Sequence, residues 1–322
     1  MTIACRMLAL ALLVCAARRT LAQPSGPDGN IPLPAPELQR RLQNDPFEIV
    51  AVGKTKGGIM ATEKLTLAFA DGERVEVKWK AAPDGGEGVD NSPRRELAAY
   101  TAQQLFLDPD DFVVPPVAVR CIPLDAYRPV DPSAKPNLPP ARCIYGTLSA
   151  WLEHVSQPDS TWDPDRFSRD LRYAYRFGNL NIFTYLIAHH DAKASNFLMS
   201  TDALDPQIFS IDNGIAFSGI YNVFTWHFDH ILVGGLPAQS IERLQRITPD
   251  DVERLAVLAE LQPDADGILR PAPASAASDH QEGVRRVGDG IQIGLTTGEI
   301  AGIRERLQAL LADVRDGKEQ VF

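Results

Sequence analysis

The residues of this chain best suited to chemistry lie in the segment HHDAKASN, residues 189–196. Asp191 and Asn196 are five residues apart within it, and Asp212 follows sixteen residues after Asn196, behind an apolar run. Phosphoryl transfer needs a carboxylate that accepts the proton of an attacking hydroxyl, and oxygen ligands that hold Mg²⁺ on the phosphates. The spacing therefore predicts Asp191 as the base, with Asn196 and Asp212 as the metal ligands.

Three lysines are placed to neutralise phosphate charge near these residues. Lys193 lies two residues after Asp191, where its ammonium group would stabilise the transferring phosphoryl group. Lys78 and Lys80 lie upstream in the run VEVKWK and, because successive strand residues alternate, they point to the same face. The spacing alone leaves open which of the two reaches the phosphates.

The elements that must position these residues begin with an antiparallel meander. Short alternating or β-branched runs predict its strands, and Asp71-Gly72 predicts a hairpin turn between two of them. A helix follows, because apolar residues recur at helical spacing after Pro93 until Asp108-Pro109 stops the run. The expected order is strands at 47–52, 64–70 and 74–80, a helix at 94–107, and strands at 117–122 and 142–149.

The second half of the chain predicts more helix. Apolar stripes and threonine caps favour long helices, and only two strand-like fragments interrupt them. The Pro-, Ala- and Gly-rich segment 262–290 is expected to be a surface excursion. Helices are expected at 166–189, 249–261 and 297–314, and strands at 196–199 and 207–217.

These residues and their order resemble the protein-kinase-like superfamily over roughly residues 47–217. HHDAKASN matches the kinase catalytic loop H-R-D-x-K-x-x-N with its second position changed, and the triplet at 212–214, Asp-Asn-Gly, stands where Asp-Phe-Gly would. Residues 75–80 resemble the third strand, whose lysine reaches the phosphates, and Glu96 resembles the helix glutamate that pairs with that lysine. Residues 53–58, which include Gly57 and Gly58, lie where a glycine-rich loop would cover the nucleotide.

The resemblance implies an α+β, bilobal kinase-like fold. Residues 47–150 would form a small antiparallel β-rich N-lobe with one helix, and residues 151–322 a larger, mainly helical C-lobe. It also implies ATP as phosphoryl donor and Mg²⁺ or Mn²⁺ as the metal. Lys80 is favoured slightly over Lys78 for the phosphates, because an aromatic-Lys pair ends the strand in atypical relatives.

Departures from the kinase pattern narrow the resemblance. His190 replaces the arginine that pairs with a phosphorylated activation loop, Asn213 replaces the phenylalanine, and no Ala-Pro-Glu follows. The chain is therefore more similar to the atypical branch, which includes phosphoinositide 3- and 4-kinase-like proteins and the secretory-pathway kinases that phosphorylate casein-like proteins. The segment HFDH, residues 227–230, is interpreted as solvated surface.

Two other functions fit the same residues. A small-molecule phosphotransferase of the aminoglycoside or choline type carries a similar loop, and a non-catalytic kinase-like binding module could retain it. The sequence does not identify the phosphate acceptor, which could be a protein, a lipid headgroup or a small molecule. Nucleotide binding that requires Mg²⁺ would separate both kinds of enzyme from the binding module.

Composition and the amino terminus restrict partners and location. The 322 residues are 44% hydrophobic and 23% charged, as in globular proteins, and the formal net charge of −10 argues against a nucleic-acid partner. The apolar run Met7–Ala17 is too short to span a membrane and predicts a signal peptide over residues 1–22. The protein is expected to be exported, periplasmic or secreted, with a flexible lead-in over residues 23–46 and no stable membrane span after cleavage.

Removal of the signal peptide would leave two cysteines, Cys121 and Cys143, on either side of a Pro-rich segment. In an oxidising compartment they have one possible internal pairing, which would close a loop of about 20 residues. Two buried free thiols are the alternative. The sequence does not supply the distance that would decide between them.

Overall fold

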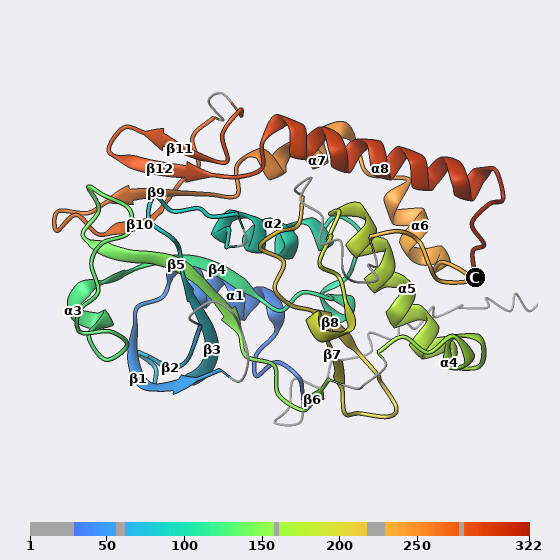
Figure 1. Ribbon diagram of the computed structural model, residues 1–322, viewed down its shortest axis with the longest axis horizontal. Helices are drawn as coiled ribbons and strands as arrows, with labels where there is room; N and C mark the ends of the chain where they lie inside the picture. Colours follow the sequence, from blue (N-terminus) through green and yellow to red (C-terminus); the bar gives the residue numbers. More distant parts are fainter. Residues whose placement is uncertain (1–28, 56–61, 90, 158–160, 218–228, 277–279) are drawn as a thin grey trace, which may run out of the picture.

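The computed structural model describes residues 29–55, 62–89, 91–157, 161–217, 229–276 and 280–322. Its first lobe is a five-stranded antiparallel sheet with the order β1-β2-β3-β5-β4 (Figure 1). The predicted meander, helix and two later strands are confirmed in type and order. The elements are β1 (Phe47–Lys54), β2 (Glu63–Phe69), β3 (Arg74–Ala81), α2 (Pro93–Gln103), β4 (Val117–Pro123), α3 (Leu124–Tyr127) and β5 (Cys143–Ala150).

The two faces of this sheet bury different side chains. Val77 and Trp79 of β3 point to one face, where they pack with Leu38 and Leu42 of helix α1 (Ala35–Asn44). The opposite face of β4 and β5 packs against α2. Because side chains alternate along β3, Glu76, Lys78 and Lys80 lie on the face turned away from α1.

Helix α1 corrects the expected lead-in at residues 23–46. Leu38 and Leu42 are one helical turn apart and fully buried, so this segment is part of the core from Ala35 onward. Pro34 and the proline at N2 suit the start of a helix. The i,i+4 leucine pair was the sequence signal for this element.

The second lobe is built around α4 (Pro164–Arg169) and α5 (Leu171–Leu186). The helix expected over 166–189 is broken at Asp170, whose carboxylate accepts from the backbone N–H groups of Arg172 and Tyr173 and so caps α5. A small sheet of order β6-β7-β8 lies beside α5 (Figure 1). The remaining elements of this region are β6 (Val155–Ser156), β7 (Phe197–Ser200), β8 (Ile208–Ser210), α6 (Ala238–Leu244), α7 (Pro249–Glu253) and α8 (Thr297–Arg315).

A four-stranded antiparallel sheet replaces the surface excursion expected over 262–290. Its order is β10-β9-β12-β11, and Figure 1 shows it next to the first lobe, with α2 between it and the second lobe. Pro271 is tolerated because β10 is an edge strand. The helix expected at 249–261 is correspondingly shorter, because α7 ends at Glu253 and the chain then enters this sheet. The strands are β9 (Ala259–Pro263), β10 (Leu269–Ala272), β11 (Val284–Val287) and β12 (Gly290–Ile293).

The disulfide between Cys121 and Cys143 is confirmed, with Cα atoms 5.4 Å apart. It joins the neighbouring strands β4 and β5, and both cysteines are buried in the core that also contains α2. The expected signal peptide lies outside the described residues. Among the described helices, none is both long enough and apolar enough to cross a membrane.

Candidate active site

The loop after α5 brings three of the predicted residues together; we call Asp191, Lys193 and Asn196 the loop cluster. Lys193 Nζ lies 2.6 Å from one carboxylate oxygen of Asp191, and Asn196 Nδ2 donates to the other at 2.8 Å and to the Asp191 carbonyl at 2.9 Å. Asp191 is thus held from both sides. The turn into the loop uses a positive φ of 47° at Ala188, a conformation uncommon outside glycine.

A second group of predicted residues, Lys78, Lys80, Glu96 and Asp212, forms what we call the strand–helix cluster. Lys78 Nζ forms an ion pair with Asp212 Oδ1. Burial opposes ionisation of Asp212, but Lys78, followed by Lys80 and His189, outweighs that effect and lowers the pKa of Asp212. Asp212 is therefore a carboxylate at neutral pH, which is the form that binds phosphate-bound cations.

Glu96 is the buried member of this cluster. Its Oε2 accepts from the backbone N–H of Asn213 at 3.1 Å, which ties helix α2 to the residue after Asp212. Burial raises the pKa of Glu96, although the charges of Lys80 and, less strongly, Lys78 pull it down. The two lysines thus have different main partners. Lys78 forms an ion pair with Asp212, whereas Lys80 lowers the pKa of Glu96 more than Lys78 does.

One backbone contact joins the two clusters. The N–H of Ile211 donates to the carbonyl of Asn196 at 2.9 Å, so the residue before Asp212 is fixed to the end of the loop cluster. His189 is fully buried, and its charge contributes to the lowered pKa of Asp212. Gly57 and Gly58 lie outside the described residues.

His190 and Asp229 form a pair that the sequence did not suggest. His190 Nδ1 donates to Asp229 Oδ2 at 2.8 Å, and both side chains are buried, which corrects the interpretation of residue 229 as solvated surface. Burial opposes ionisation of Asp229, yet the hydrogen bond from His190 and the nearby His230 lower its pKa overall. The chain after residue 228 is thereby attached to the residue next to Asp191.

Trp151 extends the polar face of the first-lobe sheet toward the connection between the lobes. Its backbone N–H donates to the Glu76 carbonyl at 2.9 Å, and Lys64 Nζ lies 4.5 Å from the centroid of its indole ring. Lys64 also bonds the Glu76 carboxylate at 2.6 Å and pairs in register with Lys78. In the sequence, the signal for the group of Lys64, Glu76 and Trp151 was a tryptophan just after a predicted strand.

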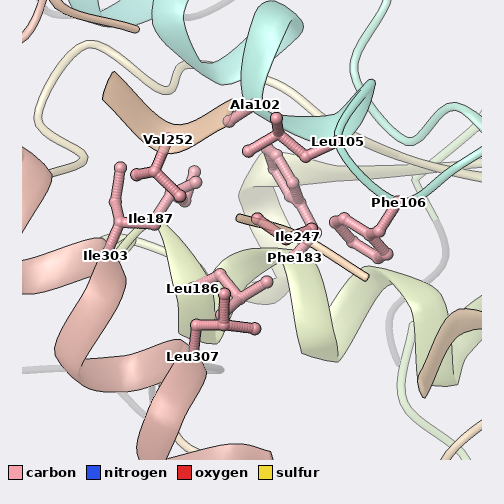
Figure 2. Close-up of a pocket in the computed structure, with 10 residues that line it drawn as sticks. All are labelled: Ala102, Leu105, Phe106, Phe183, Leu186, Ile187, Ile247, Val252, Ile303 and Leu307. Atoms are coloured by element: carbon pink, nitrogen blue, oxygen red, sulfur yellow. The ribbon is translucent and has the colours of Figure 1, made fainter. Parts of the chain in front are cut away.

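An apolar cavity lies apart from both clusters (Figure 2). Its volume of about 20 Å³ leaves room for one water molecule, yet every lining side chain is hydrocarbon, so it is a packing void between α2, α5 and α8. It has no part in the candidate site. The lining residues are Ala102, Leu105, Phe106, Phe183, Leu186, Ile187, Ile247, Val252, Ile303 and Leu307.

The oxygen atoms of Asp212 and Asn196 suit a hard divalent cation that also has ligands from outside the protein. Within the described part of the chain, no group of three His, Cys, Asp or Glu side chains could hold a metal alone. Asp212 offers a carboxylate and Asn196 an amide oxygen, and Mg²⁺ commonly takes one or two protein ligands together with substrate phosphates and water. The residues therefore suit a cation that arrives with a phosphorylated ligand.

Comparison with known proteins identifies the fold. No protein-family model matches the chain, and no curated protein matches it. Among solved structures, hydra Fam20 with sugar has a TM-score of 0.52 at 13% identity, over 89% of this chain and 92% of that one. The Golgi casein kinase with Mn and ADP bound has a TM-score of 0.49 at 12% identity, over 87% and 75%.

The likeness to hydra Fam20 shows the fold alone: the described residues of this chain adopt the kinase-like fold of that protein. The expected bilobal α+β class is confirmed, and the resemblance to the atypical branch is confirmed as a likeness of fold. The first lobe matches the expectation closely. The second carries the small sheet β6-β7-β8 in addition to its helices, and the four-stranded sheet β10-β9-β12-β11 lies next to the first lobe.

Proposed function

We propose that this protein is an exported kinase that transfers the γ-phosphoryl group of ATP, with Mg²⁺ or Mn²⁺, to a hydroxyl group of a protein or lipid. The observation that carries the proposal is the junction of the loop cluster with the strand–helix cluster through Ile211 and Asn196. The two joined clusters contain carboxylate, amide and lysine side chains, which are residue types that phosphoryl transfer uses. The kinase-like fold supports the same conclusion.

In the proposed reaction, the acceptor hydroxyl attacks the γ-phosphorus, the bond from phosphorus to ADP breaks, and Asp191 takes the hydroxyl proton. Lys193, 2.6 Å from Asp191, would stabilise charge on the transferring group. Lys78 and Lys80 would bind donor phosphates, and Glu96 would orient Lys80. Asn196 and Asp212 would hold the divalent cation, which neutralises phosphate charge when it is bound.

Export is supported by the disulfide between Cys121 and Cys143, because such bonds persist mainly in oxidising compartments. The amino-terminal residues 1–22 have the composition of a signal peptide. Both features fit a protein that works outside the cytosol.

Three variants test the proposal. Wild-type protein should gain thermal stability from ATP only when Mg²⁺ is present, because a ligand that binds the folded state stabilises it. Asp212→Ala should abolish that gain, whereas Asp191→Ala should keep it and lose transfer from radiolabelled ATP by about 100-fold or more. Glu305→Ala, an equal loss of charge at an exposed site on α8, is the control.

The acceptor is sought with the same radiolabelled ATP against protein, lipid and small-hydroxyl substrates. Label in a small molecule alone would favour the aminoglycoside- or choline-type alternative. Mg²⁺-dependent binding with no transfer to any acceptor would favour the binding module. Equal transfer by Asp191→Ala and wild type would contradict the kinase mechanism.

A further inference from the structure

The amino end of α2 is bonded to the amino end of α8, far from it in sequence. Arg94 forms two hydrogen bonds with the carboxylate of Glu299, at 2.6 and 3.1 Å, and Arg95 Nε donates to the same carboxylate at 3.0 Å. Arg94 and Glu299 are 4% and 8% exposed. One carboxylate thus holds two adjacent guanidinium groups of α2.

Other contacts close the space around Arg94. Its Nη1 also donates to the carbonyl of Gly294 at 3.3 Å, and its Nε donates to Glu87 at 2.8 Å. A Cβ atom on Gly283 would lie 1.9 Å from Arg94 Nε, so the arginine lies directly on the backbone of the segment that enters β11. Arg94 therefore has no room to follow α2 if that helix rotates.

Glu299 is fixed as firmly as its partners. It is the third residue of α8 and forms a capping box, in which its carboxylate accepts from the Thr296 backbone while Thr296 accepts from the Glu299 backbone. Burial raises the pKa of Glu299, but the hydrogen bonds and charge of Arg94 outweigh it, and the net pKa is lowered. The carboxylate is thus charged when it binds the two arginines.

Glu96 is the next residue along α2 and faces another partner. Arg94 and Arg95 bond Glu299, whereas Glu96 bonds the backbone of Asn213 beside Asp212. Neighbouring residues of a helix differ by about 100° around its axis, so fixing the first two sets the direction of the third. We propose that Glu299 is a positioning residue that holds α2 in the orientation in which Glu96 meets the lysines and Asn213.

This inference rests on the proposed function for the role of Glu96 toward the lysines. The hold of Glu299 on Arg94 and Arg95 of α2 does not depend on that function. Loss of the Glu299 charge would leave two guanidinium groups in a confined space with one carboxylate fewer. The helix would then gain freedom to turn, and Glu96 would leave its place in part of the population.

Glu299→Gln is the test variant, because glutamine keeps the shape and can still complete a capping box. Thr296→Ala weakens the cap but keeps the Glu299 carboxylate and its hydrogen bonds to both arginines. Glu253→Gln removes the ion pair between Glu253 of α7 and Arg304 of α8 and leaves the bonds of Arg94 and Arg95 to Glu299 in place. These two controls report what general damage to α8 does.

Two measurements are made on each full-length variant at a temperature where circular dichroism shows it folded. The dissociation constant for ATP with Mg²⁺ should rise at least fivefold in Glu299→Gln and stay within twofold of wild type in the controls. Amide hydrogen exchange over residues 93–103 should be faster in Glu299→Gln alone.

The outcomes separate the inference from the proposed function. Wild-type protein that binds no ATP with Mg²⁺ contradicts the proposed function, and the exchange measurement then decides the role of Glu299 by itself. Unchanged exchange in α2 of Glu299→Gln overturns the inference, as does a normal dissociation constant in that variant when wild type binds. Equal weakening in Glu299→Gln and Thr296→Ala also overturns it, since only the start of α8 would then matter.

Discussion

Asp229 is a carboxylate outside the loop cluster that helps to fix the position of that cluster. Its bond to His190 holds the chain that follows residue 228 against the residue next to Asp191. Asn181 of α5 reinforces this attachment, because its amide donates to the His230 carbonyl at 2.7 Å and accepts from the Leu232 N–H at 2.8 Å. The loop cluster is therefore braced by side chains that carry out no chemistry themselves.

The Asp229 carboxylate should stabilise the fold in a pH-dependent way. Asp229→Asn is expected to lower the free energy of unfolding by about 1.5–3 kcal/mol at pH 7, the range for hydrogen bonds to charged groups. The folded pKa is below the unfolded value of about 3.9, so this contribution is complete above that value and is lost as pH falls through the folded pKa. Urea unfolding at pH 7 and at about pH 3 should show a smaller difference between variant and wild type at the lower pH.

Trp151 gives a prediction about where the nucleobase of ATP, the proposed phosphoryl donor, binds. If Lys78 and Asp212 bind phosphates, the nucleobase would lie toward Trp151, whose ring offers a stacking surface worth about 1–3 kcal/mol. Trp151→Ala should therefore weaken ATP binding by about tenfold, whereas Trp151→Phe should weaken it less. Binding of inorganic tripolyphosphate with Mg²⁺, measured by calorimetry, should be the same in all three proteins; a matching loss of tripolyphosphate binding would contradict this placement.

At the scale of elements, the disulfide joins β4 to β5, the pair of strands that packs on α2. Reduction, or the double variant Cys121→Ala/Cys143→Ala, should lower the free energy of unfolding by roughly 2–4 kcal/mol. Mass spectrometry of unreduced mature protein should find the bridge, and two alkylatable thiols would refute it. Reducing agent should have no effect on the double variant.

Elements with local signals could be predicted from the sequence, and those with non-local support could not. The strands around Asp71-Gly72 alternate and share a tight turn, so their pairing follows from adjacent residues. The strands β9–β12 are short, and two of them contain proline, so their stability depends on packing against the rest of the core. The local hairpin signals there were Asp266-Gly267, between β9 and β10, and the Gly-Asp pair at 288–289, between β11 and β12.

At the scale of the whole molecule, the sequence order predicted which residues converge but not what holds them. The roles proposed for Asp191, Asn196 and Asp212 follow from fixed spacings near one helix and one strand. The partners of α2 are separated from it by 205 residues, and no periodicity relates positions that distant. Burial of Asp229 likewise depends on a return of the chain to α5 that no local pattern records.

The last part of the chain should be indispensable to a site that contains none of its residues. A protein ending at residue 255 keeps both clusters but loses β9–β12 and α8, and with them the partner of Arg94 and Arg95. We expect this truncation to lose cooperative unfolding and nucleotide binding. Thermal melts followed by near-ultraviolet circular dichroism would test this, with deletion of residues 1–28 as a control that should unfold cooperatively.

The bond between α2 and α8 also bears on the order in which the molecule can be assembled. A ribosome releases residue 94 long before residue 299, so the first lobe must wait for the end of synthesis before α2 acquires its buried partner. Contacts this remote in sequence make folding slow, because a long loop must close before they form. During that interval the arginines of α2 lack their carboxylate, and the apolar surface meant for the last sheet is open to aggregation. A newly made chain would thus carry every reacting group of its site for some time before it could use them.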